Sequence, residues 1–263
     1  MKKIISAAVL SVVVFAAAGQ AQASFGNDQL TQVFYTKDNN KVEIGVDLGS
    51  IVGTGAIDLT AKHKTLSNLD VAGLAATKGA ALNELRMGYY IDSLINTSDA
   101  VWDHYFATST TTIPTTPNAT KYSLMNSAAG SIASFYGATN SVVVTDPTNA
   151  NAYRTKMNQG NTAPGVYANM NTSVTPGEIV LADMTGGYTD MYLWHFSYDK
   201  PAGASTKTSH LVAGATTDYT AVLRFYANGQ TVLNPAPVPV PAAIWMLGSG
   251  LVGLIGLRRK QEA

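Results

Sequence analysis

The chain has 263 residues, no cysteine, and equal numbers of basic and acidic side chains, 17 of each. This length allows one domain with a sizeable core, and without cysteine that core must hold the fold together without disulfides. The two ends hold five of the cations but only one acidic residue, so the central part of the chain is net acidic, which argues against nucleic acid as a partner.

The first residues have the pattern of a secretory signal peptide. Two lysines precede a short apolar run, and Ala21 and Ala23 then occupy the small-residue positions that signal peptidase requires. We therefore expect signal peptidase to remove residues 1–23, which leaves residues 24–234 as a β-rich exported body.

The body opens with the clearest hairpin pattern in the chain. A strand-like run over residues 30–35 leads to a turn at residues 38–40, whose Asp and Asn side chains can bond their own backbone. Apolar residues over 42–48 then alternate with Glu43, Gly45 and Asp47. This period of two predicts a strand with one buried face.

The next part of the body gives weaker signals. Residues 74–85 could form a short helix, although Gly73 and Gly79 weaken it. Residues 85–91 and 101–106 favour paired strands because they are rich in aromatic and branched side chains.

Helical spacing of apolar residues predicts one helix, over residues 119–136, with Gly137 placed to end it. Residues 146–175 are dense in Asn, Thr, Gly and Pro, which predicts a long connection with little regular structure. The predicted fold class is mainly β: a single β-sandwich body, jelly-roll-like, with one short helix, plus a C-terminal transmembrane helix. Further strands are expected at residues 178–182, 189–198, 218–226 and 231–233.

The end of the chain combines a proline-rich linker, an apolar segment and a basic tail. Prolines at alternate positions fix φ over residues 235–241 and remove backbone donors, which predicts an extended linker. Residues 242–257 carry no charge and would form a transmembrane helix of about 24 Å, although a bilayer core measures about 30 Å. The alternative is a buried core helix, which the prolines before it and the cations after it disfavour. Residues 258–263 form the cytoplasmic tail, where Arg258, Arg259 and Lys260 act as a membrane stop.

A short motif lies within this tail. Its residues are Val238, Pro239, Val240, Pro241 and Ala242, followed by an aliphatic run with Trp245 and by Gly248-Ser249-Gly250. In motif, spacing and position the tail resembles a PEP-CTERM sorting signal, although Val240 stands where the family usually has glutamate, which indicates a subtype. The resemblance implies that an exosortase, a membrane-embedded cysteine transpeptidase of Gram-negative bacteria that make exopolysaccharide, recognises the tail and cleaves it near the Pro-x-Pro motif.

The body has no recognisable pattern of catalytic or metal-binding residues. Its four histidines, His63, His104, His195 and His210, lack metal-ligand spacing and any nucleophile arrangement. Asp183 and Asp190 flank two glycines, where an ordinary turn is favoured over a calcium loop. We therefore expect that the protein is not an enzyme and has no catalytic residues, metal or cofactor.

Aromatic side chains gather in the predicted strands, and two interpretations of them stay open. Exposed aromatic rings on a sandwich can stack on sugar rings, whereas alternating members of the set can fill the core. The set comprises Tyr89, Tyr90, Trp102, Tyr105, Tyr188, Tyr192, Trp194, Phe196 and Tyr198.

The sequence thus indicates a protein that passes through an inner-membrane intermediate to the cell surface or the extracellular space. The resemblance implies a structural or adhesive role in the exopolysaccharide layer of a biofilm matrix. The alternatives are a carbohydrate-binding β-sandwich module and a polysaccharide-modifying hydrolase, although a hydrolase signature is missing. The expected partners are signal peptidase, the exosortase, the membrane before processing, and exopolysaccharide.

Overall fold

The computed structural model describes residues 25, 28–36, 38–51, 55–91, 95–98, 101–111, 119–137, 140–157, 177–199, 208–211 and 219–237. Its strands are β1 (Gln29–Thr36), β2 (Glu43–Ser50), β3 (Lys64–Asn68), β4 (Leu85–Ile91), β5 (Ile95–Ser98), β6 (Val101–Thr108), β7 (Val142–Thr145), β8 (Glu178–Val180), β9 (Tyr188–Asp199), β10 (Thr208–Leu211), β11 (Ala221–Tyr226) and β12 (Gln230–Leu233). The α-helices are α1 (Val71–Ala76), α2 (Ala119–Tyr136) and α3 (Tyr153–Met157), and the short 3-10 helices are η1 (Leu82–Glu84) and η2 (Leu181–Asp183).

The strands pair antiparallel along one path, in the order β3-β12-β11-β9-β6-β4-β1-β2-β7, with β10 on β9, β5 on β6 and β8 on β4. The pairing is very uneven along this path. β6 pairs with β9 along its whole length, whereas β4 and β6 meet at the single residue pair Tyr90 and Phe106. The path therefore divides at this junction into a first sheet (β7, β2, β1, β4, β8) and a second sheet (β6, β9, β11, β12, β3, with β5 and β10).

The two sheets pack face to face around the main hydrophobic core. The rings of Phe34 on β1 and Phe225 on β11 lie 4.9 Å apart, and both side chains are fully buried. A polar contact also crosses the core, where the Thr231 hydroxyl donates to the Gln32 side-chain oxygen at 2.9 Å. The mainly β fold with two antiparallel sheets is therefore confirmed.

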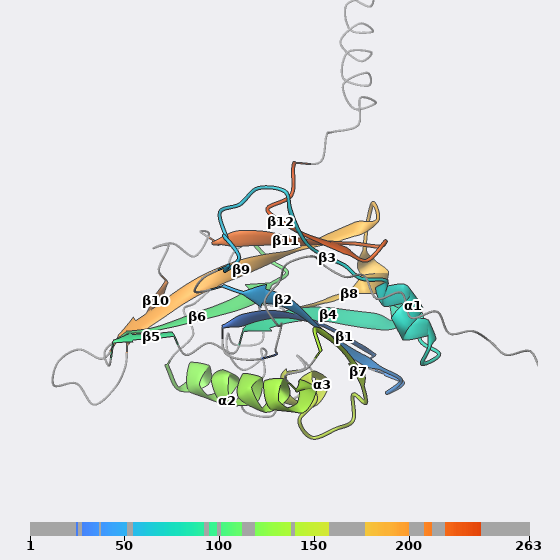
Figure 1. The fold of residues 1–263 in the computed structure, drawn as a ribbon, viewed down its shortest axis with the longest axis horizontal. Helices are drawn as coiled ribbons and strands as arrows, with labels where there is room; N and C mark the ends of the chain where they lie inside the picture. Colours follow the sequence, from blue (N-terminus) through green and yellow to red (C-terminus); the bar gives the residue numbers. More distant parts are fainter. Residues whose placement is uncertain are drawn as a thin grey trace, which may run out of the picture.

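A third layer covers the outer face of the first sheet. Helices α2 and α3 lie on one side of the strands, and β11 and β12 lie on the other (Figure 1). The ring of Tyr136 on α2 packs against Gly45 of β2 so closely that a Cβ at Gly45 would overlap it. The prediction of one buried face for β2 was wrong, because Glu43 on the other face is fully buried as well.

Two local predictions are confirmed. Strands β1 and β2 form the expected hairpin, with Tyr35 opposite Glu43. Helix α2 spans residues 119–136 as predicted, and Gly137, with φ of 81°, ends it. Alternation and helical spacing are local patterns, so the sequence around each element was sufficient.

Two other predictions need correction. The helix expected at residues 74–85 is α1, which begins earlier because the Asp70 side chain accepts from the backbone N–H of Gly73 at 2.8 Å. The chain then takes a left-handed φ of 70° at Gly79. The segment after residue 146 also contains regular structure, since α3 begins at Tyr153.

No helix within the described ranges is both long and apolar enough to cross a membrane. The predicted signal peptide and the transmembrane helix at residues 242–257 lie outside the described residues.

We predict that residues 24–237 fold without the tail. Among the described residues, the two buried hydrophobic clusters run from Phe25 to Leu233, so this segment contains an extensive core of its own. The isolated segment should be soluble, rich in β-structure by circular dichroism and cooperative on heating. A disordered spectrum would contradict this prediction.

Candidate functional site

The outer face of the second sheet carries a group of aromatic and charged side chains. Because side chains alternate along a strand, the buried core positions Met191, Leu193, Leu223 and Phe225 leave their neighbours on the opposite face. We define the outer aromatic face as Tyr188, Asp190 and Tyr192 on β9, Arg224 and Tyr226 on β11, and Tyr219 just before β11.

Arg224 lies at the centre of this face and is held in one orientation. Its Nε and Nη2 donate to the two carboxylate oxygens of Asp190 at 2.6 and 2.8 Å. Its guanidinium lies 4.0 Å from the centre of the Tyr188 ring, and the Tyr188 and Tyr226 rings are 6.1 Å apart. The bidentate pair and the ring contact fix the guanidinium plane, and the two charges neutralise each other.

A second aromatic group lies next to this pair. The ring of Tyr219 is 4.8 Å from that of Tyr192 and 6.0 Å, edge on, from that of Trp194. Trp194 itself is fully buried and donates to the Thr108 hydroxyl at 2.8 Å. Tyr219 keeps 38% of its surface exposed, so its ring is available for contact while Trp194 supports it from below.

The chain leaves the body beside the outer aromatic face, at Asn234. The backbone N–H of Asn234 donates to the Val222 carbonyl at 2.7 Å, and its side-chain oxygen accepts from the Val222 N–H at 2.9 Å. Its side-chain nitrogen donates to the carbonyls of Leu59 and Ala61 at 2.7 and 3.0 Å. The Asn234 carbonyl accepts from the His63 N–H at 3.0 Å. This residue therefore joins β11 to the loop before β3.

The residues after Asn234 turn away from the sheet. Asn234 has a left-handed φ of 44°, and Pro235 follows it without a backbone donor. Nη1 of Arg224 reaches the carbonyl of Ala236 at 3.4 Å. Ala236 and Pro237 are exposed, so the chain is in solvent two residues after Asn234.

Glu43 is a carboxylate buried beneath the helices. It accepts from the Tyr136 hydroxyl at 2.6 Å and from the backbone N–H groups of Tyr153 and Arg154 at 2.8 and 2.9 Å. Burial raises the pKa of Glu43, and these three donors oppose that rise. The carboxylate thus fastens both α2 and the start of α3 to β2.

Glu178 is a second carboxylate in this layer, and it accepts from the Tyr35 hydroxyl at 2.6 Å. It is 3% exposed, and burial, followed by the charge of Glu178, raises the pKa of Tyr35. Sequence reasoning missed both carboxylates. The available signal was Gly45 beside Glu43, because a glycine on a strand face leaves room for a covering side chain.

We predict that Asp47→Asn stabilises the body near neutral pH. Burial raises the pKa of Asp47 from 3.8 to about 6. The protonated carboxyl therefore contributes its full stability at pH values below the pKa of Asp47 in the unfolded chain, and this contribution is lost as the pH rises through 6. Removing the charge should raise the free energy of unfolding by about 1–3 kcal/mol at about pH 7 and change it little at about pH 4.

Urea unfolding of residues 24–237 at both pH values measures this difference. The control is Asp58→Asn, because Asp58 is exposed and its pKa is lowered by hydrogen bonds from Thr60. A wild-type pH profile in the Asp47→Asn protein would contradict the prediction.

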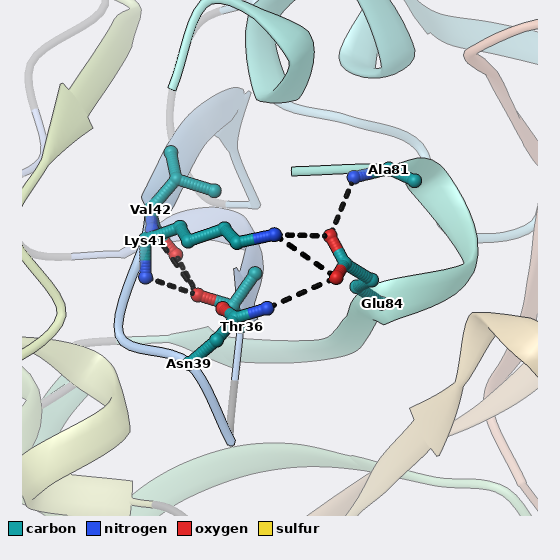
Figure 2. Close-up of polar contacts among 6 residues, drawn as sticks. All are labelled: Thr36, Asn39, Lys41, Val42, Ala81 and Glu84. Atoms are coloured by element: carbon teal, nitrogen blue, oxygen red, sulfur yellow. Dashed lines mark hydrogen bonds and ion pairs between the residues drawn. The ribbon is translucent and has the colours of Figure 1, made fainter. Parts of the chain in front are cut away.

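A shallow pocket of about 510 Å³ lies between the β1–β2 turn and the end of β7, lined by Asn40, Lys41, Lys78, Val144, Thr145, Asp146 and Thr148. Lys41 is already engaged there, as Figure 2 shows: its Nζ donates to both Glu84 oxygens at 3.0 and 3.1 Å. Glu84 also accepts from Asn39 and from the Ala81 N–H, which lowers its pKa. These contacts tie the hairpin turn to η1 and give the pocket wall a structural role.

The residues singled out as possible metal or catalytic groups are dispersed. His195 stacks on Tyr105, with ring centres 4.2 Å apart, and Asp190 is paired with Arg224. Within the described residues, no group of three or more His, Asp or Glu side chains could hold a metal ion. The predicted aromatic set is divided, since Tyr89, Tyr90 and Trp194 are buried while Tyr188 and Tyr192 lie on the outer aromatic face.

The predicted sorting and processing residues lie outside the described residues, although Pro237, just before the motif, is described. They are Ala21, Ala23, Val238, Pro239, Val240, Pro241, Ala242, Arg258, Arg259 and Lys260.

Comparison with known proteins identifies the tail. The family model of the PEP-CTERM protein-sorting motif matches residues 237–260. No curated protein and no solved structure matches the chain. The match begins three residues after Asn234, where the chain has left the body. The tail is therefore a PEP-CTERM protein-sorting motif, which implies processing by an exosortase, a membrane protein, and export to the cell envelope or surface.

Proposed function

We propose that the exported body is a structural or adhesive component of the exopolysaccharide layer. One observation carries this proposal: only Asn234, Pro235 and Ala236 separate the last strand, β12, from the first residue of the sorting motif. A signal for export to the envelope or surface is thus attached directly to a compact β-sandwich. The resemblance to the PEP-CTERM family supports exopolysaccharide as the surrounding material.

The proposed route has three steps. Signal peptidase cleaves after Ala23, and residues 242–257 then hold the precursor in the inner membrane. Arg258, Arg259 and Lys260 oppose slippage through the bilayer, at about 2.5–3.5 kcal/mol for each cation. Cleavage by the exosortase near Pro239 and Pro241 finally releases the body. Sequencing the released protein should give Ser24 as its first residue.

Fractionation of the native host tests this route. Wild type should appear in the extracellular material and be freed when the exopolysaccharide is digested. The double variant Pro239→Ala and Pro241→Ala should stay in the membrane fraction at precursor length. Pro147→Ala is the matched control, because Pro147 lies in the body, outside the matched residues. If wild type also stays in the membrane at full length, residues 242–257 form a plain anchor and the proposal fails.

A carbohydrate-binding module is the second candidate, and the outer aromatic face supports it. Tyrosine rings that keep part of their surface exposed can stack on the apolar faces of sugars, and the partly exposed Asp190 carboxylate can accept from a sugar hydroxyl. Because Arg224 and Asp190 form an ion pair, the face favours a neutral glycan over a charged one.

A glycan array probed with residues 24–237 tests this candidate. Tyr192→Ala and Tyr219→Ala should each weaken binding by about three- to tenfold, because each removes one stacking ring. Tyr219→Phe keeps the ring and should bind like wild type. If the folded wild-type protein binds no glycan on the array, the carbohydrate-binding candidate fails and only the structural or adhesive role is left.

The body is proposed not to be an enzyme, and the buried carboxylates support this view. Glu43 and Glu178 lie under the helical layer at 0% and 3% exposure, where a polysaccharide could not reach them. Their oxygens accept from tyrosines and backbone N–H groups of the same chain. An activity screen that detects cleavage of exopolysaccharide would support the hydrolase alternative instead.

A further inference from the structure

The segment that connects the folded body to the sorting motif is short. Strand β12 ends at Leu233, and the motif begins at Pro237. At about 3.1 Å per residue for an extended proline-rich segment, Pro237 lies within about 12 Å of the end of the strand. The exosortase must therefore take up the motif with the folded body directly beside it.

Two side chains of the body restrict the few residues in between. Asn234 is held by β11 on one side and by the loop at Leu59 to His63 on the other. Arg224, itself fixed by Asp190, reaches the carbonyl of Ala236. Between these two contacts lies Pro235, whose φ is fixed by its ring. The chain thus leaves the sheet in a defined direction.

Neither contact belongs to the hydrophobic core, whose last member in the described part of the chain is Leu233. If Asn234 only ended β12, it would not need both a left-handed conformation and two side-chain hydrogen bonds to a separate loop. The bonds of Asn234 join the strand that ends the body to the loop that precedes β3, and they act on the direction of the following residues.

We propose that Asn234 and Arg224 are positioning residues for sorting, because they fix the place and direction in which the motif leaves the folded body. The exosortase then receives a segment that is already ordered on its N-terminal side. Because the segment is ordered when the body folds, the entropy cost of ordering it does not reduce the affinity when the exosortase binds. Residues of the folded body therefore contribute to sorting in addition to the residues that match the family model.

Insertion variants of the full precursor in the native host test this proposal. A short Gly-Ser repeat between Ala236 and Pro237 leaves both contacts intact but uncouples the motif from them. We expect the conversion of this variant from precursor to released protein to slow by about three- to tenfold. Pulse-chase labelling and blotting measure the rate of conversion. Asn234→Gly, which keeps the left-handed turn but removes the side-chain bonds, should slow conversion in the same direction.

The matched control is an Ala-Pro repeat of the same length at the same place, which lengthens the spacer but keeps it stiff. It should be converted faster than the Gly-Ser variant. Both insertions should leave the thermal unfolding midpoint of the released body unchanged, which separates positioning from stability. Conversion of the Gly-Ser variant at or above the wild-type rate, or equal slow rates for the two insertions, would overturn the proposal.

Discussion

Replacing Glu43 with Ala is expected to cost about 3–5 kcal/mol of unfolding free energy. The change leaves three donors without their acceptor: the buried Tyr136 hydroxyl and Tyr153 N–H, and the partly buried N–H of Arg154. It also leaves a cavity between β2 and the helices. Hydrogen exchange should accelerate first in α2 and α3, because Glu43 is a polar link between the first sheet and this layer.

The control for this prediction is Glu84→Ala. Glu84 also accepts from several donors, from Lys41, Asn39 and Ala81, but it lies at the surface, where water can replace the carboxylate. Denaturant unfolding should show little change. Tyr136→Phe removes only one of the donors to Glu43 and should cost about 1 kcal/mol. Equal losses for Glu43→Ala and Glu84→Ala would show that burial of the carboxylate is not what matters.

Replacing Gly229 with Ala should destabilise the body by about 2–5 kcal/mol. Gly229 has φ of 91° in the turn between β11 and β12, and a Cβ there would overlap the backbone carbonyl of Leu69. A backbone atom cannot rotate away as a side chain can. Relief would require β12 to move away from the residues that begin α1.

Gly187→Ala is the matched control for that change. Gly187 has a similar φ of 78°, but nothing lies within 4 Å of the position of its Cβ. It should therefore show the conformational cost alone, about 1 kcal/mol. Thermal unfolding of the two variants measures the difference, and equal midpoints would contradict the role given to Leu69.

The parts of the fold that the sequence predicts well are those with local causes. The β1–β2 hairpin and helix α2 follow from alternation and spacing within each segment. Gly45 indicated that something covers the face of Glu43, but the covering side chain, Tyr136, could not be predicted because it lies 93 positions later in the chain. Helix α3 was missed for the same reason: the acceptor at its start belongs to β2 rather than to a neighbouring residue. Strand β7 is only four residues long and begins with three valines in a row, so it offers no alternation to detect.

The candidate site shows the same division. The tyrosines of β9 were recognised as a group from composition, but only the packing separates the buried Trp194 from the half-buried Tyr192. Arg224 was not singled out, because its partner Asp190 is on another strand, 34 positions away. The tail motif was identified in full, since a sorting signal is a contiguous segment whose residues act by their order along the chain.

The first and last strands of the body, β1 and β12, belong to different sheets and face each other across the core, joined by Gln32 and Thr231. They share no backbone pairing in the strand order. Tension applied between the two ends of a surface-attached molecule would therefore load the contact between the sheets rather than a ladder of backbone hydrogen bonds. Phe34 and Phe225 are part of this contact between the sheets. The mechanical strength of this protein should depend on side-chain packing, and the body should yield by separation of its two sheets.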